Sequence, residues 1–133
     1  MYKNLISAAK DEGFEKFVVR AIVLTEEEVL LIEDPATQVF GVPEAEIRSD
    51  ETIPQALNRA IIVSVGHELE EVKQYLTHYD HEKERVFYFS VKILEPRDVD
   101  PPANNKFAWT DPREAPRYPI REELREVLDL LRS

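Results

Sequence analysis

Residues 51 to 66 read ETIPQALNRAIIVSVG, and the local structure of this segment indicates how the rest of the chain is organised. Thr52 and Gln55 have capping-box spacing, in which each side chain bonds the other residue's backbone at a helix start. Pro54 is tolerated in a first helical turn, and Gly66 is a residue that commonly ends a helix. The stretch therefore predicts a helix over residues 53–65.

Extended segments are predicted on both sides of this helix. Residues with β-branched, aromatic and other apolar side chains are concentrated in five runs, at 17–24, 29–32, 70–78, 85–94 and 106–110. The polar stretch 25–28 between the first two runs predicts that they form a hairpin. After the fourth run, three prolines and two adjacent asparagines predict a surface loop at 95–105.

Helices are predicted at both ends of the chain. Residues 4–11 have a short amphipathic pattern inside an N-terminal extension over 1–16, and apolar residues recur with helical spacing after Pro119. The order of elements predicts one α+β domain over residues 1–133, with a mixed, mostly antiparallel sheet.

Composition narrows the classes of function. The chain has 133 residues with 17 basic and 27 acidic side chains, a formal net charge of −10. Such a charge repels phosphate backbones and anionic lipid, so we expect neither nucleic acid nor a membrane as partner. No cysteine is present, and no apolar run is long enough for a signal peptide or a membrane span, so we expect a cytoplasmic protein.

The predicted central helix resembles the box of the Nudix hydrolase superfamily, which reads G-x5-E-x7-R-E-U-x-E-E-x-G-U with U a bulky aliphatic residue. Glu51, Arg59, Ile61 and Gly66 fall on matching positions without gaps. Residues 17–34 are similar to the family's opening hairpin, and residues 107–115 to its late aromatic strand and loop. The resemblance implies an α/β/α sandwich, and for the family it implies hydrolysis of nucleoside diphosphates linked to a further group, with Mg²⁺ or Mn²⁺.

The sequence departs from the family at the residues that carry its chemistry. Ala60, Val63 and Ser64 stand where the family has metal-binding glutamates. Three further departures are Ala45 at the opening glycine, His67 at the final aliphatic residue, and Asn104 and Asn105 where some relatives keep an acidic base. We therefore expect no catalytic residue, no metal site and no cofactor, with Glu51, Arg59 and Gly66 kept as a structural remnant of the box.

Two other interpretations stay open. Glu68, Glu70 and Glu71 follow the predicted helix and provide carboxylates for a relocated Mg²⁺ or Mn²⁺ site in an active hydrolase. The three histidines, His67, His78 and His81, are a weaker donor set and are read as turn residues. Alternatively, the apolar run 60–63 provides a surface for a structural homodimer.

Three residues are candidates for ligand binding. Arg20 lies in the first predicted strand, where its side chain can meet a phosphate if it faces a cleft. Phe107 and Trp109 can stack on a base. The leading hypothesis is a Nudix-fold protein that has lost metal-dependent pyrophosphohydrolase activity and acts as a nucleotide-derivative-binding, regulatory or interaction module.

Overall fold

The computed structural model describes residues 2–99 and 106–131. The elements in chain order are α1 (Lys3–Asp11), β1 (Lys16–Val23), β2 (Val29–Glu33), β3 (Phe40–Gly41), β4 (Glu44–Glu46), α2 (Ile53–Val65), β5 (Leu69–His81), β6 (Glu84–Ile93), β7 (Phe107–Thr110) and α3 (Glu122–Leu130). Short 3₁₀ turns lie at Pro96–Asp98 and Ala115–Arg117. Part of the predicted loop at 95–105, including Asn104 and Asn105, lies outside the described residues.

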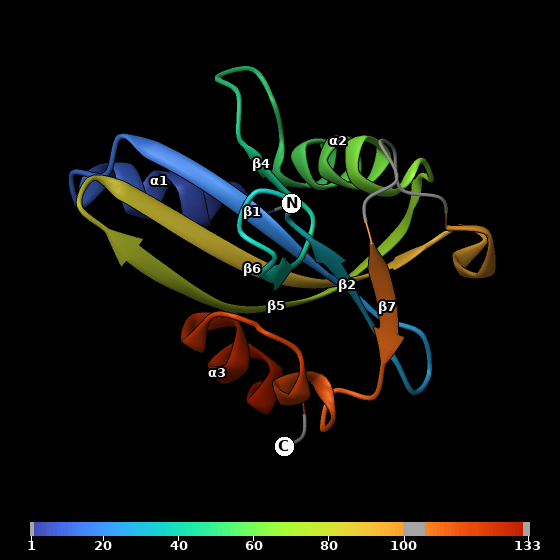
Figure 1. Ribbon diagram of the computed structural model, residues 1–133. Coiled ribbons are helices and arrows are strands. Elements are labelled where there is room, and N and C mark those ends of the chain that lie inside the picture. The colour runs from blue at the N-terminus through green and yellow to red at the C-terminus, as the bar shows by residue number, and fades with distance from the viewer. Residues whose placement is uncertain (1, 100–105, 132–133) are drawn as a thin grey trace.

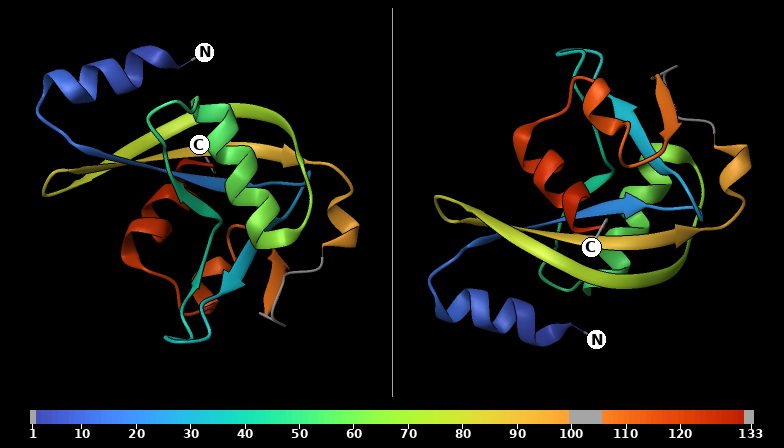
Figure 2. Two further views of the ribbon diagram at one scale, coloured as in Figure 1. Left: turned by 90° about the horizontal axis from the view of Figure 1, so that it is seen from above. Right: turned by 90° about the horizontal axis from the view of Figure 1, so that it is seen from below.

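Within the described residues the strands form a four-stranded sheet, in the order β4-β1-β6-β5, and a three-stranded sheet, in the order β3-β2-β7. The β1–β6 pair is parallel, whereas the other pairs are antiparallel. Figure 1 shows α2 on one side of the larger sheet and α3 on the other, and the two views of Figure 2 show the same layers from above and below. The predicted α+β class and α/β/α layering are confirmed.

The two central strands of the larger sheet, β1 and β6, contribute side chains to two hydrophobic cores, one on each face of the sheet. Successive side chains of a strand point to opposite faces of the sheet. In β1, the side chains that pack in the core between the sheet and α2 are Phe17, Val19, Ala21 and Val23. Those of Val18 and Ile22 pack in the core between the sheet and α3. In β6 the same alternation separates Phe87 and Phe89 from Val86 and Tyr88. A strand buried on both faces is apolar at nearly every position, which explains the continuous apolar runs in the sequence.

The predicted hairpin between the first two strands is wrong. β1 and β2 belong to different sheets and share a single bridge, between Leu24 and Val29. Both edges of β1 are already occupied, by β4 on one side and β6 on the other. Since both edges of β1 are paired over residues 18–20, β2 pairs along its length with β3 and β7 instead.

Helix α2 spans Ile53–Val65, as predicted, but α3 begins later than predicted. The Pro119 carbonyl accepts a hydrogen bond from the backbone of Phe40 at 2.8 Å, and Ile120 forms a parallel bridge with Phe40. These contacts hold the segment extended, so the helix starts at Glu122 with Arg121 at its N-cap. The segment that was predicted as a first helical turn therefore ties α3 to β3.

Side chains of strand β5 do not keep to one face at alternate positions, as they would in a regular strand. Val72 packs against the core under α2, whereas Leu76 packs against the core over α3. Three register shifts against β6 exchange the two faces along β5, as β-bulges do.

In the described part of the chain, no helix has the length and apolar character needed to cross a bilayer.

Candidate ligand-binding cleft

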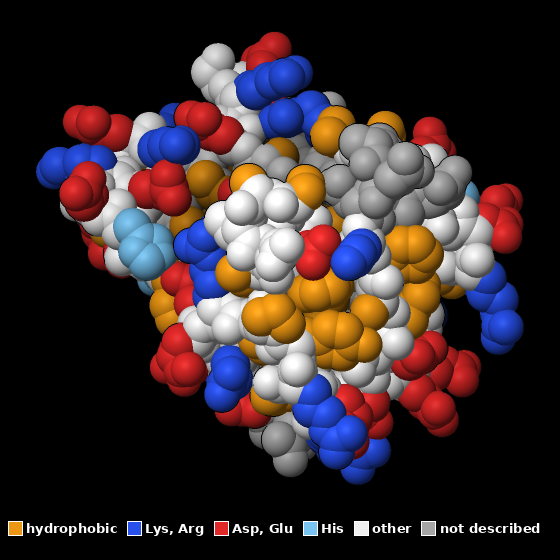
Figure 3. All heavy atoms as spheres, viewed as in Figure 1, with side chains coloured by type: hydrophobic (Ala, Val, Ile, Leu, Met, Phe, Trp, Pro, Cys, Tyr) orange, Lys and Arg blue, Asp and Glu red, His pale blue; other side chains and the backbone are white. Residues whose placement is uncertain are grey.

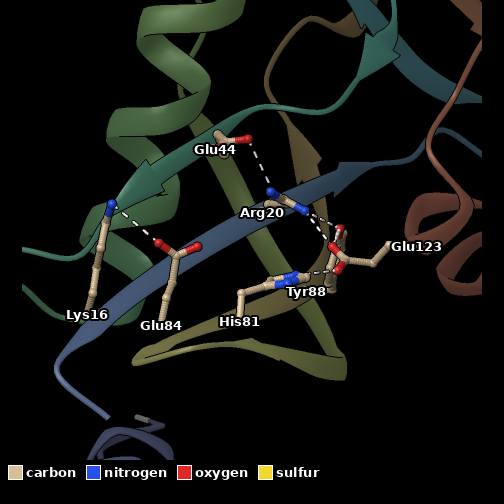
Figure 4. Close-up of polar contacts among 7 residues, drawn as sticks. All are labelled: Lys16, Arg20, Glu44, His81, Glu84, Tyr88 and Glu123. Atoms are coloured by element: carbon tan, nitrogen blue, oxygen red, sulfur yellow. Dashed lines mark hydrogen bonds and ion pairs between the residues drawn. The ribbon is translucent and has the colours of Figure 1, made fainter.

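The Arg20 side chain contacts residues on three other elements, β4, β6 and α3. It extends from β1, is 21% exposed, and its Nη1 donates hydrogen bonds to Tyr88 Oη at 2.5 Å and to Glu123 Oε2 at 2.6 Å. Its Nε lies 3.4 Å from Glu44 Oε1, close enough for an ion pair, although the angle does not make a hydrogen bond. Figure 4 shows Arg20 pointing between Glu44 on β4 and Glu123 on α3.

Glu123 accepts hydrogen bonds from three side chains. Tyr88 Oη donates to Oε2 at 2.5 Å, Arg20 donates to the same oxygen, and His81 Nε2 lies 2.9 Å from Oε1. Burial acts to raise the pKa of the Glu123 carboxyl, but the hydrogen bonds from Tyr88 and His81 and the charge of Arg20 outweigh it, so this pKa lies below its ordinary value. Glu123 is therefore held as a carboxylate.

Burial also acts on the phenol that faces this carboxylate. It is the largest cause that raises the pKa of Tyr88, and the hydrogen bond to Glu123 adds to it. Tyr88 consequently stays a neutral donor near pH 7. The cluster thus consists of one guanidinium, two carboxylates and one neutral phenol, with His81 at its outer edge.

A cleft of about 440 Å³ adjoins this cluster. Its walls come from β1, the β2–β3 segment, β4, α2, β6 and α3. The lining residues are Arg20, Ile32, Glu33, Asp34, Thr37, Val39, Phe40, Gly41, Val42, Glu44, Ser64, Tyr88, Arg121, Glu123 and Leu124. The volume and the mixture of apolar and polar groups are those of a small-molecule site.

The α2 positions that lack the expected glutamates lie in three different environments. Ala60 is buried, Val63 is 66% exposed, and Ser64 lines the cleft. Ile62 is also exposed, whereas Ile61 is fully buried. The apolar run 60–63 is therefore half core and half surface, and self-association through its exposed half stays a prediction.

Glu51 and Arg59 form a bidentate ion pair that holds the loop before α2. Arg59 Nε and Nη2 each lie 2.9 Å from a Glu51 oxygen, and Nη2 also donates to the Glu46 carbonyl at 2.5 Å. The hydrogen bond from Arg59 lowers the pKa of the Glu51 carboxyl. Neither residue lines the cleft, so the geometry gives this pair a bracing function.

The ends of α2 have the predicted caps. Thr52 and Gln55 make both bonds of the capping box, at 3.2 Å and 2.8 Å. Gly66 takes a left-handed conformation, with φ of 75°, and its N–H bonds the Ile62 carbonyl.

The structure does not bring Phe107 and Trp109 together with Arg20. Both aromatic residues lie on β7 and line a separate hollow with Arg97 and the acidic turn 26–28. Figure 3 shows hydrophobic side chains gathered on the face of the molecule that carries β7. Of the three candidates for ligand binding, Arg20 alone lines the cleft.

The histidines and the post-helix glutamates do not converge. His67 bonds the Asp98 carbonyl at 2.6 Å, His78 bonds Tyr75, and His81 bonds Glu123. Glu68, Glu70 and Glu71 are exposed at the start of β5. Among residues 2–99 and 106–131, no three His, Asp or Glu side chains are grouped closely enough to hold a metal ion.

Sequence reasoning missed the three residues that contact Arg20 in the cleft. Tyr88 lies within the apolar run of β6, Glu44 is the first residue of β4, and Glu123 lies in the first turn of α3. One signal was available for Tyr88, because a buried tyrosine hydroxyl needs a hydrogen-bond partner. No sequence pattern links Glu44 or Glu123 to Arg20.

Comparison with solved structures agrees with the resemblance. The fold is similar to a Nudix hydrolase of Nitrosomonas europaea (TM-score 0.72, 22% identity, 89% of this chain and 68% of that chain), and to MutT from Aliivibrio salmonicida or Vibrio cholerae (0.76, 16%, 86% and 94%). It is also similar to an ADP-ribose pyrophosphatase of Streptococcus suis (0.69, 14%, 89% and 92%). No family sequence model and no curated protein sequence matches the chain. The chain has the Nudix fold.

Proposed function

We propose that this Nudix-fold protein binds a nucleotide-like small molecule in the cleft beside Arg20 and does not hydrolyse it by the family's metal-dependent route. The observation that carries the proposal is the α2 surface at Ala60, Val63 and Ser64, which adjoins the cleft through Ser64 and has no carboxylate. The cleft is retained, whereas the acids that hold the metal in the family are replaced.

The loss of these acids removes a large electrostatic attraction for a divalent cation. Positions 63 and 64 lie three and four residues after position 60 and therefore near it along α2, and Mg²⁺ and Mn²⁺ prefer oxygen ligands. A unit charge attracts an opposite charge about 4 Å away by roughly 4 kcal/mol at an effective dielectric of 20. One serine hydroxyl on this face does not replace three carboxylates.

The test has two measurements on the whole protein. Isothermal calorimetry in a chelator, with adenosine, AMP and ADP-ribose as probes, is expected to show that at least one of them binds. Ser64→Trp, which fills the cleft, should abolish that binding, while Val63→Trp, on the exposed neighbouring position, should leave it unchanged. If none of the probes binds, or if both variants bind equally, the proposed site is wrong.

The second measurement is turnover of ADP-ribose with Mg²⁺ or Mn²⁺. We expect no release of AMP above a metal-free control. Metal-dependent release that Ser64→Trp abolishes would support the alternative, an active hydrolase with relocated ligands, and would overturn the non-hydrolytic part of the proposal.

A further inference from the structure

The walls of the cleft carry a net negative charge. Carboxylates are contributed by Glu33, Asp34, Glu44 and Glu123, against the guanidinium groups of Arg20 and Arg121, which gives a formal charge of −2. A cleft lined by one sign of charge concentrates ligands of the opposite sign and repels those of the same sign. An anionic ligand therefore meets repulsion here unless a cation accompanies it.

Arg20 does not offset this repulsion for an incoming anion. Its Nη1 already donates to Tyr88 and Glu123, and its Nε faces Glu44. A phosphate that bound Arg20 through Nη1 would displace Glu123, whose side chain is 16% exposed and would keep its charge without its guanidinium partner. Arg20 thus already offsets the charges of Glu44 and Glu123, and its own charge is included in the net −2 of the wall.

The other cation of the cleft lies at its rim. Arg121 is exposed at the N-cap of α3, where water and salt screen its charge. Glu33, at the end of β2, is partly buried, and its carboxylate has no hydrogen bond or ion pair within the described part of the chain. The negative charge of Glu33 is therefore less solvated than the positive charge of Arg121.

We infer that the cleft selects the uncharged base or nucleoside part of a nucleotide-like ligand and binds it more weakly as phosphates are added. This inference rests on the proposed function, because no metal on α2 is available to neutralise the phosphates. Carboxylate oxygens accept hydrogen bonds from ring N–H and exocyclic amino groups of bases. Phe40, Val42 and Leu124 provide apolar wall for the ring.

The experiment is calorimetry with guanosine, GMP and GDP, repeated with adenosine, AMP and ADP, all in a chelator at low salt. We expect the dissociation constant to rise at least about threefold with each phosphate, because each adds negative charge near the cleft. Raising the salt from about 0.05 M to about 0.5 M should shrink this penalty, since the Debye length falls from about 10 Å at 0.1 M to about 3 Å at 1 M.

Two variants distinguish the effect of charges in the cleft from the effect of the net charge of the protein on phosphate binding. Glu33→Gln should reduce the penalty per phosphate, whereas Glu70→Gln, which removes the same charge at an exposed site on β5, should leave it unchanged. Equal effects of the two variants would overturn the assignment to the cleft.

The outcomes for the inference and for the proposed function differ. GDP or ADP binding more tightly than its nucleoside in chelator would overturn the inference and leave the proposed function standing. If no member of either series binds, the proposed function itself fails.

Discussion

Arg20 and Glu123 are 103 residues apart in the sequence, yet Arg20 Nη1 lies 2.6 Å from Glu123 Oε2. The pair joins β1 of the central sheet to α3, and Tyr88 of β6 bonds both side chains. The Arg20–Glu123 ion pair holds α3 against the sheet, and both residues form part of one wall of the cleft.

Glu123→Gln should lower the free energy of unfolding by about 1 to 3 kcal/mol, because it weakens charge-assisted hydrogen bonds in a mostly buried cluster. Urea unfolding followed by circular dichroism measures this. Glu84→Gln is the control, since it breaks the more exposed Lys16–Glu84 pair drawn in Figure 4 and should cost less than about 1 kcal/mol. Equal losses in the two variants would contradict the importance assigned to the cluster.

Acid should destabilise the fold through four carboxyl groups. The pKa values of Glu12, Glu51 and Asp80 are lowered chiefly by hydrogen bonds from arginines, and that of Glu123 is lowered despite burial. A carboxyl with a lowered folded pKa contributes stability that is present above its ordinary pKa, 4.5 for Glu or 3.8 for Asp, and is lost as the pH falls through the folded value.

The free energy of unfolding should therefore fall steadily as the pH drops below 4.5, in urea titrations at a series of pH values. Asp80→Asn removes one of the four groups and should make this acid slope shallower. A main loss of stability near pH 6.5, where histidine titrates, would contradict this assignment.

Glu51→Gln should destabilise the protein by about 1 to 3 kcal/mol, because Arg59 loses a bidentate carboxylate that is only 11% exposed. Glu114→Gln, in the exposed pair with Arg117, is the matched control and should change the urea midpoint little. Because neither Glu51 nor Arg59 lines the cleft, the probe that binds the native protein should bind Glu51→Gln with the same affinity.

Restoring two acids on α2 tests whether their loss removed metal binding. Val63→Glu/Ser64→Glu places one carboxylate on the cleft wall, at position 64, and one at the exposed neighbouring position 63, and Mn²⁺ calorimetry should detect binding that the native protein lacks. The double variant Ile62→Glu/Ser7→Glu adds the same charge at separated exposed sites and should not bind. Equal Mn²⁺ binding by the native protein would show that other ligands hold the metal.

Gly66→Ala should cost about 1 to 2 kcal/mol in unfolding free energy, because a side chain is strained at the φ of 75° that ends α2. Gly41→Ala is the control, since Gly41 does not have a positive φ and an added Cβ meets nothing within 4 Å. Thermal unfolding of both variants compares the two positions.

Local rules account for the parts of the fold that the sequence predicted correctly. The capping box, the Gly66 stop and the helix between them depend on residues within a few positions of one another. The hairpin prediction failed because pairing of β1 depends on β6, a strand more than sixty residues away. The late start of α3 has the same cause, since a contact with Phe40 holds Pro119 and Ile120 extended.

The class of fold and the absence of acids at Ala60, Val63 and Ser64 follow from the amino-acid sequence alone, because they depend on residue identity and short-range periodicity. The contacts of Arg20 with Glu44, Tyr88 and Glu123, and the separate location of Phe107 and Trp109, follow from the three-dimensional fold. Strand pairing and helix docking bring these residues together, and the charges and hydrogen-bonding groups involved have no fixed spacing in the sequence.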